Sequence, residues 1–179
     1  DNAETRGAKL DAIGDSFTVW ASLANGSTST LYFPDEGEVF ENDGTSFKSD
    51  PAYFWPGAGT LNFTAVANAP ASRFVPNLNT AGTALESFTY TVPADATAQN
   101  DIVLATESVG GANNATVPLH FKHIMSAVNF KVGRIVEGEI RKIQVQGIYN
   151  KATYNIEQNV WVLDKASNGN FDVVVADGV

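Results

Sequence analysis

The sequence contains no cysteine among its 179 residues. Disulfide bonds, thiolate nucleophiles, cysteine-based zinc sites and iron–sulfur clusters are therefore excluded together. Basic residues are also few, because 11 Lys and Arg stand against 20 Asp and Glu, which gives a formal net charge of −9. A chain with this balance has no basic surface to neutralise phosphates, so we expect no nucleic-acid partner.

Long apolar runs and helix-forming residues are scarce as well. No run reaches the roughly 18 apolar residues of a membrane-spanning helix, and the first residues lack the order of a signal peptide. The 9 Leu and 1 Met are far outnumbered by the 41 Val, Ile and Thr residues, while 15 Gly and 7 Pro supply turns. This composition favours strands and argues against a helical bundle.

Hydrophobic alternation predicts a series of short strands. From Phe17 onward, Phe17, Val19 and Ala21 share one face of a predicted strand, and Trp20 points to the other face, toward a second sheet or a rim. Alternation in the segment 87–92 has the same form. About nine or ten such strands at this spacing are typical of a β-sandwich. We therefore predict an all-β fold of two mainly antiparallel sheets with about 7–10 strands.

Other segments are assigned by the same criteria. The acidic stretch 35–50 and residues 68–84 are expected to be loops, because turn-forming and charged residues dominate there. In residues 127–132, Val128, Phe130 and Val132 are expected to point inward. Further strands, with a hairpin turn near 157–159, are expected at 31–33, 61–65, 101–105, 117–121, 140–146, 154–156 and 160–162.

Groups that carry chemistry are sparse. The only imidazoles, His120 and His123, would point to opposite faces of a strand and so could not share a metal. The run Glu41-Asn42-Asp43-Gly44 has a fragment of a calcium loop but lacks the rest of its frame. No nucleophile elbow or phosphate loop is present. We expect no metal, no cofactor and no enzymatic activity; two carboxylates converging in a deep pocket would favour a hydrolase instead.

Aromatic residues form a candidate binding surface. Exposed rings can stack on the apolar faces of sugars, so Tyr53, Trp55 and Trp161 are candidate glycan-stacking residues. Because side chains alternate across a strand, the three successive rings of Tyr53-Phe54-Trp55 cannot all face one way. Packing in the core is the alternative interpretation of these rings.

Several segments together resemble a known family. They are Tyr53-Phe54-Trp55-Pro56 with Leu61-x-Phe63-x-Ala65, then QNDIVLA (99–105), VPLHFKHIMSAVNFKV (117–132), Ile143-x-Val145-x-Gly147-Ile148-Tyr149, Ala152-x-Tyr154-Asn155 and Trp161. Their order and spacing over residues 5–162 resemble the fimbrillin family, the type V pilins and fimbrillin-like surface lipoproteins of Bacteroides-type bacteria.

The resemblance implies a non-enzymatic structural subunit of a cell-surface, outer-membrane fimbria that contributes to adhesion. It implies a transthyretin-like β-sandwich, the N-terminal one of two domains. Family precursors are lipoproteins exported through the periplasm and cut by a trypsin-like protease near the first strand. A strand from a neighbouring subunit then fills the groove that the cut opens, which is a form of β-augmentation.

Carried onto this sequence, the resemblance names specific residues. Thr5-Arg6-Gly7 matches the family's processing boundary, which makes Arg6 the first candidate for cleavage and Lys9 the second. Phe17, Val19 and Ala21, next to the exchanged strand, are the candidate assembly groove.

The expected domain organisation and partners follow from the same resemblance. Residues 1–9 are expected to be a flexible arm, 10–165 the β-sandwich domain, and 166–179 a linker or the start of a further domain. Partners would be other fimbrial subunits and a host surface protein or glycan, with membrane contact only through a lipid anchor that this chain lacks. The alternative function is a monomeric surface module that binds glycans or acts as an adhesive tip.

Overall fold

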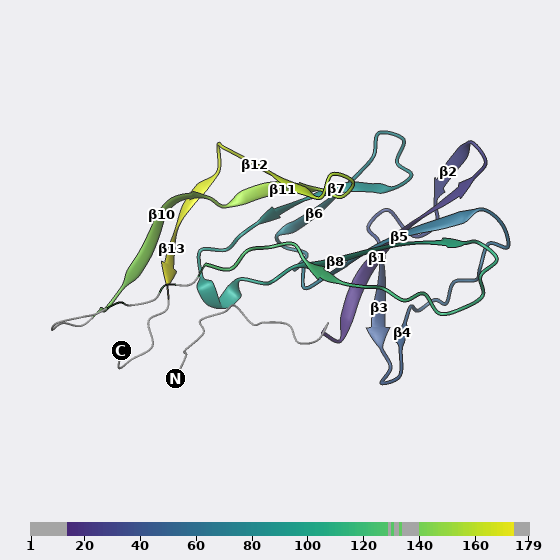
Figure 1. Cartoon of the computed structure of the whole chain (residues 1–179), viewed down its shortest axis with the longest axis horizontal. Coiled ribbons are helices and arrows are strands. Elements are labelled where there is room, and N and C mark those ends of the chain that lie inside the picture. The colour runs from purple at the N-terminus through teal and green to yellow at the C-terminus, as the bar shows by residue number, and fades with distance from the viewer. Residues whose placement is uncertain (1–13, 129, 131–132, 134–139, 174–179) are drawn as a thin grey trace.

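The computed structural model describes residues 14–128, 130, 133 and 140–173 (Figure 1). These residues form strands and one short 3-10 helix, η1 (Ala96–Ala98). In chain order the strands are β1 (Ser16–Asn25), β2 (Thr28–Leu31), β3 (Glu38–Asn42), β4 (Phe47–Lys48), β5 (Thr60–Ala67), β6 (Phe74–Leu78), β7 (Leu85–Thr91), β8 (Val103–Gly110), β9 (Lys122–His123), β10 (Ile143–Tyr149), β11 (Lys151–Asn155), β12 (Val160–Leu163) and β13 (Asn168–Val173). Within this described part, no helix is long and apolar enough to cross a membrane.

The strands form a β-sandwich, which confirms the predicted fold class. The larger sheet has the order β4-β3-β1-β5-β8-β9, and β2 also pairs with β1. The second sheet has the order β12-β11-β7-β6. All pairings among the described strands are antiparallel. The expected hairpin near 157–159 is present as β11 and β12.

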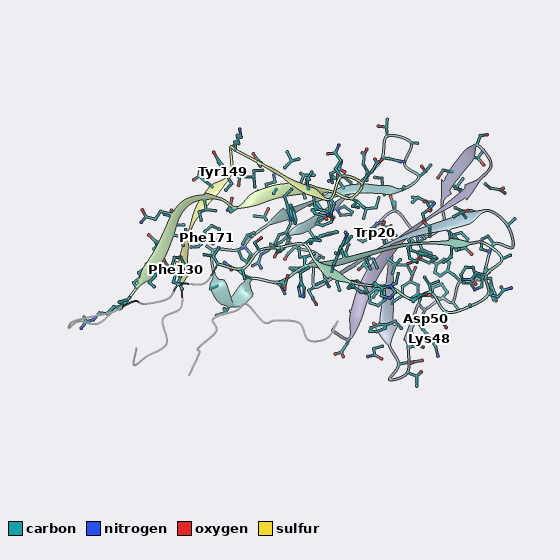
Figure 2. All side chains as sticks on the ribbon, viewed as in Figure 1. Trp20, Lys48, Asp50, Phe130, Tyr149 and Phe171 are labelled. Atoms are coloured by element: carbon teal, nitrogen blue, oxygen red, sulfur yellow. The ribbon has the colours of Figure 1, made fainter. Side chains whose placement is uncertain are left out.

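The main core lies between these two sheets. Trp20 of β1 is 3% exposed and faces the second sheet, where its ring centroid lies 5.8 Å from that of Phe74. Phe88 of β7 is fully buried, and its centroid lies 4.7 Å from Phe74 and 5.4 Å from Tyr154 of β11. Figure 2 labels Trp20 among the side chains near the paired strands β1 and β5. Trp20 therefore covers a second sheet, one of the two positions expected for it.

A third, two-stranded sheet extends from the second. β10 pairs with β13, and in the chain these two strands continue β11 and β12 (Figure 1). Asn150 marks the break between β10 and β11: its carbonyl accepts from the Val92 N–H at 2.7 Å, and its Oδ1 accepts from Ser167 Oγ at 2.7 Å. Such interruptions raise the count of described strands above the expected range.

Strands occur in two segments that were expected to be loops. The acidic segment 35–50 contains the β3–β4 hairpin, and the segment 68–84 contains β6. In β3 the inward positions are half-buried, as at Phe40, while Glu41 points to solvent, so charge on one face does not prevent a strand. β6 contains Pro76, which an edge strand tolerates because the missing N–H costs no ladder bond.

Two segments that were expected to be strands, 117–121 and 127–132, are not assigned as strands among the described residues. Of the segment 117–132, the strand β9 covers only Lys122 and His123. Val128 and Phe130, expected to point inward, are 71% and 45% exposed, which corrects that expectation. Val132 lies outside the described residues. Alternation at Val128 and Phe130 gave the wrong answer because no strand in the described part pairs with these two residues.

The expected domain limits remain predictions at both ends. Residues 1–9 and 174–179 lie outside the described residues. Within the segment 166–179, the strand β13 pairs with β10, with Ile143 opposite Val173 and Val145 opposite Phe171.

The core packing generates a stability prediction. Replacing Phe88 by Ala should lower the free energy of unfolding by about 3–5 kcal/mol, because a fully buried ring leaves a cavity that its aromatic neighbours cannot fill. Urea unfolding measures this change. Val75→Ala is the matched control, since Val75 lies on the same sheet but is 56% exposed, and it should cost less than about 0.5 kcal/mol. Equal effects of the two substitutions would contradict this assignment of the core.

Candidate functional site

The outer face of the larger sheet, turned away from the second sheet, carries its own apolar cluster. Phe17, Val19 and Ala21 of β1 are all buried on this face. Beside them lie small side chains of β5 and β8, including Ala65 and Ala105, both fully buried. The three residues predicted for the assembly groove therefore lie together in one cluster.

No second sheet covers this outer face in the described part of the chain. Its cover consists of the β3–β4 hairpin, the loop 49–55 and the extended segment 116–121. Between this cover and the sheet lies a cavity of about 610 Å³, here called the aromatic pocket. Rings that line the pocket include Phe17, Tyr32, Phe33, Phe40, Phe63 and Phe121.

Phe17 makes three of the aromatic contacts in this pocket. Its ring stacks on Phe40 at a centroid distance of 6.0 Å and lies 4.8 Å from Phe47, so it joins β1 to the β3–β4 hairpin. On another side it meets the edge of Phe121 at 5.2 Å. One residue of β1 thus contacts two of the three covering segments, the hairpin and the segment 116–121. Aromatic pairs of this kind add about 0.5–1.5 kcal/mol each beyond the area they bury.

The turn of the β3–β4 hairpin fixes one wall of the pocket. Asp43 Oδ1 accepts hydrogen bonds from Thr45 N–H at 2.9 Å, Thr45 Oγ1 at 2.8 Å and Ser46 N–H at 2.9 Å. Asp43 Oδ2 lies 2.5 Å from Lys48 Nζ. The Lys48 ammonium and then the Thr45 hydroxyl hold the pKa of Asp43 well below its usual range. Figure 2 places Lys48 and Asp50 at this end of the sheet.

Tyr53 and Trp55 line the aromatic pocket, as does Phe54 between them. The Tyr53 hydroxyl donates to Glu38 Oε2 at 2.7 Å, and this bond raises the pKa of Tyr53. Its ring meets the edge of Phe33 at 4.6 Å. Phe54 is 86% exposed, the most exposed large apolar residue described, and sequence reasoning did not select it. Its backbone carbonyl accepts from the Tyr32 hydroxyl.

Trp161 lies elsewhere. Its indole Nε1 donates to the Ile124 carbonyl at 2.7 Å, and its ring meets the edges of Phe88 at 5.7 Å and Tyr154 at 5.0 Å. Trp161 therefore packs against the core between the sheets, on the other side of the larger sheet from Tyr53 and Trp55. The structure brings two of the three candidate glycan-stacking residues together and separates the third.

The remaining polar candidates do not form a shared site. His123 Nδ1 lies 2.7 Å from Asp101 Oδ2, and His120 is an exposed neighbour that takes no part in this contact. Glu38, Glu41, Asp43 and Asp50 line a second cavity of about 460 Å³ beside the hairpin. Among the described residues, no group of three or more His, Asp and Glu side chains is arranged to hold a metal ion.

Comparison with known proteins identifies the family of the chain. The sequence model of a family described as fimbrillin-like matches residues 5–177. Because the match spans nearly the whole chain, the chain belongs to the fimbrillin-like family. This family is one of structural, non-enzymatic proteins, and membership indicates a subunit of a cell-surface fimbria that assembles with other fimbrial subunits. No curated protein and no solved structure matches the chain.

Sequence reasoning found the floor of the pocket and missed most of its cover. Phe40 and Phe47 were missed because they lie in the acidic segment, where charge masked the alternation of the hairpin. Phe121 was placed on a strand, yet it reaches the pocket from an extended segment without ladder partners. Leu119 and Phe121 both pack against the apolar cluster of the outer face, and the Phe121 ring meets the Phe17 ring at 5.2 Å.

The Asp43 turn generates a pH prediction. Since the pKa of Asp43 is lowered in the folded protein, its contribution to the turn is complete above the ordinary pKa and is lost only as the pH falls through the lowered value. In NMR titrations, the Thr45 and Ser46 amide shifts should therefore move at a lower pH than an unperturbed aspartate allows. Lys48→Met should raise that midpoint, because Lys48 is the largest cause of the shift. A midpoint unchanged by Lys48→Met would contradict this account.

Proposed function

We propose that this fimbrial subunit assembles by donor-strand exchange and that the aromatic pocket receives side chains of the incoming strand. The supporting observation is that Phe17 and Val19 line a cavity of about 610 Å³ under loops and a hairpin, with Ala21 buried beside them in the same apolar cluster. A strand laid across such a floor buries alternate side chains, at roughly 25 cal/mol for each Å² of apolar surface removed from water.

Unpaired backbone in the larger sheet supports the same proposal. β5 pairs with all of β8, from Val103 to Gly110. On its other edge β8 pairs with β9 only at Val103 and Leu104. Residues 105–110 of β8 therefore have no ladder partner on that edge among the described residues. Main-chain groups of this kind provide affinity when an extended segment is added to a sheet.

The glycan-binding alternative is less well supported. Tyr53 and Trp55 do line the pocket, yet its rings already contact one another, as Tyr53 and Phe33 do. Two of the polar side chains at the wall are already engaged by the Asp43 turn, because the Thr45 hydroxyl and the Lys48 ammonium both contact the Asp43 carboxylate. Sugars need several directed polar partners. Saturable binding on a glycan array would favour this alternative.

Processing and export complete the proposal. Arg6 is the first cleavage candidate and Lys9 the second; both lie outside the described residues. In this proposal the precursor is a lipoprotein that reaches the outer membrane through the periplasm, and the fimbria contributes to adhesion. The domain limits 1–9, 10–165 and 166–179 belong to the same proposal.

Trimming should be required for assembly. Limited trypsin digestion of the full-length protein should cut after Arg6 or Lys9 and yield a ladder of oligomers on native gels. Alanine at both positions should abolish the ladder, because the arm then stays attached and the groove stays closed. Mass spectrometry of the new N-terminus identifies the cut. If the trimmed protein stays monomeric, strand exchange is the wrong mechanism.

Charge in the pocket should also prevent assembly. Phe47→Asp places a carboxylate on the pocket wall, where an incoming apolar strand would bury it without a partner, so oligomer yield should fall at least about tenfold. Val75→Asp, on the exposed face of β6, should assemble like the parent protein. Circular dichroism checks that both variants fold. Normal assembly of a folded Phe47→Asp variant would show that the strand docks elsewhere.

A further inference from the structure

In the described part of the chain, one wall of the aromatic pocket is held by backbone hydrogen bonds only at its two ends. Residues 112–121, here called the strap, connect the end of β8 to β9. Val117, Leu119 and Phe121 are half-buried and line the pocket, while Pro118 and His120 between them are exposed. The strap therefore contributes side chains to the pocket as a strand would.

The first end of the strap is held firmly. The Gly111 N–H donates to the Gly59 carbonyl at 2.8 Å, and the Gly57 N–H donates to the Gly111 carbonyl at 2.9 Å. A Cβ at Gly111 would lie 2.1 Å from the Ala58 carbonyl oxygen, so the two backbones are in close contact. Gly110, by contrast, has open space where a Cβ would be.

The middle of the strap lacks backbone support. Residues 114–121 make no backbone hydrogen bond with any part of the chain that the structure describes. The far end is β9, whose two residues pair with Val103 and Leu104. One further backbone bond, from the Ile124 N–H to the Ile102 carbonyl at 3.3 Å, follows directly, and Trp161 Nε1 donates to the Ile124 carbonyl at 2.7 Å just beyond it. A ladder this short resists opening weakly, because segments with few backbone bonds and few buried contacts open at low cost.

A side-chain contact reinforces this far end. His123 Nδ1 lies 2.7 Å from Asp101 Oδ2, next to the pairing of His123 with Val103. The other oxygen, Asp101 Oδ1, is buried without a hydrogen-bond partner. The Asp101 backbone is held separately, since Asn68 Nδ2 donates to its carbonyl at 3.2 Å. With one oxygen desolvated and unpaired, the carboxylate depends on His123 for its side-chain hydrogen bond, and such bonds are stronger than neutral ones.

We infer that the strap is a movable wall of the aromatic pocket and that the His123–Asp101 contact is the latch that keeps it closed. Opening would start at β9 and pivot at Gly111, exposing Phe121 and the pocket floor. This inference rests on the proposed function for what enters the pocket, namely an apolar strand. The latch itself is a property of the isolated subunit and can be tested without assembly.

The test uses the absence of cysteine in this chain. Pro118→Cys on the strap and Val75→Cys on the second sheet, both exposed positions, accept one spin label each. Double electron–electron resonance then measures the distance between the labels. The parent should give one narrow distribution. His123→Ala and Asp101→Ala should each add a broader population at longer distance, and the double variant should add no more than either alone, because both remove the same contact.

His120→Ala is the matched control. It removes an exposed imidazole from the strap without touching the latch and should leave the distribution narrow. The His123 side chain is 50% exposed, so His123→Ala should leave the fold intact. It therefore tests the latch even if Asp101→Ala unfolds the protein. A narrow distribution in His123→Ala, or equal broadening in His120→Ala, would overturn the latch.

The assembly assay separates this inference from the proposed function. If the strap opens in His123→Ala and this variant forms oligomers severalfold faster than His120→Ala, the latch and the proposed function are both supported. If the distance distribution never changes while Phe47→Asp still abolishes assembly, the latch fails and the proposed function survives. If the strap opens but Phe47→Asp assembles normally, the latch stands and the docking site is wrong.

Discussion

The alternation of side chains along β1 is the constraint on which the rest of the structure depends. Because successive residues point to opposite faces, Trp20 enters the core between the sheets while Phe17, Val19 and Ala21 join the apolar cluster of the outer face. A slip of one residue in the pairing of β1 would exchange these sets. That register is fixed on both edges, by β5 along most of the strand and by β3 and β2 in turn.

The two faces of the larger sheet are covered differently, and this difference explains the pocket. The inner face meets large partners such as Phe88 and Tyr90, which fill the space between the sheets. The outer face contributes Phe17, Val19 and Phe63 to the pocket, with Ala21, Ala65 and Ala105 buried beside them. Rings that reach in from loops and from the hairpin touch at their edges and leave an opening, because loop segments cannot interdigitate as regularly as a second sheet.

The sequence was sufficient for the fold class and for the pocket floor, and insufficient for the cover. Alternation in β1 and β5 predicted the buried faces because both strands are long and paired on both edges. β3 was missed because its acidic residues hid the alternation, in which Phe40 is half-buried and Glu41 faces solvent. Val128 was misplaced since periodicity cannot say whether a pairing partner exists. Trp161 carried no local signal that would separate a core ring from an exposed one.

Gly110 and Gly111 are neighbours in the chain and yet bear opposite constraints. Space is open around the first, whereas the second presses its backbone against Ala58. Among natural variants of this protein, position 110 should accept many side chains, while position 111 should stay glycine even where the strap changes in length or composition. Two adjacent glycines should therefore be under different selection, loose at Gly110 and strict at Gly111, the proposed pivot of the pocket wall.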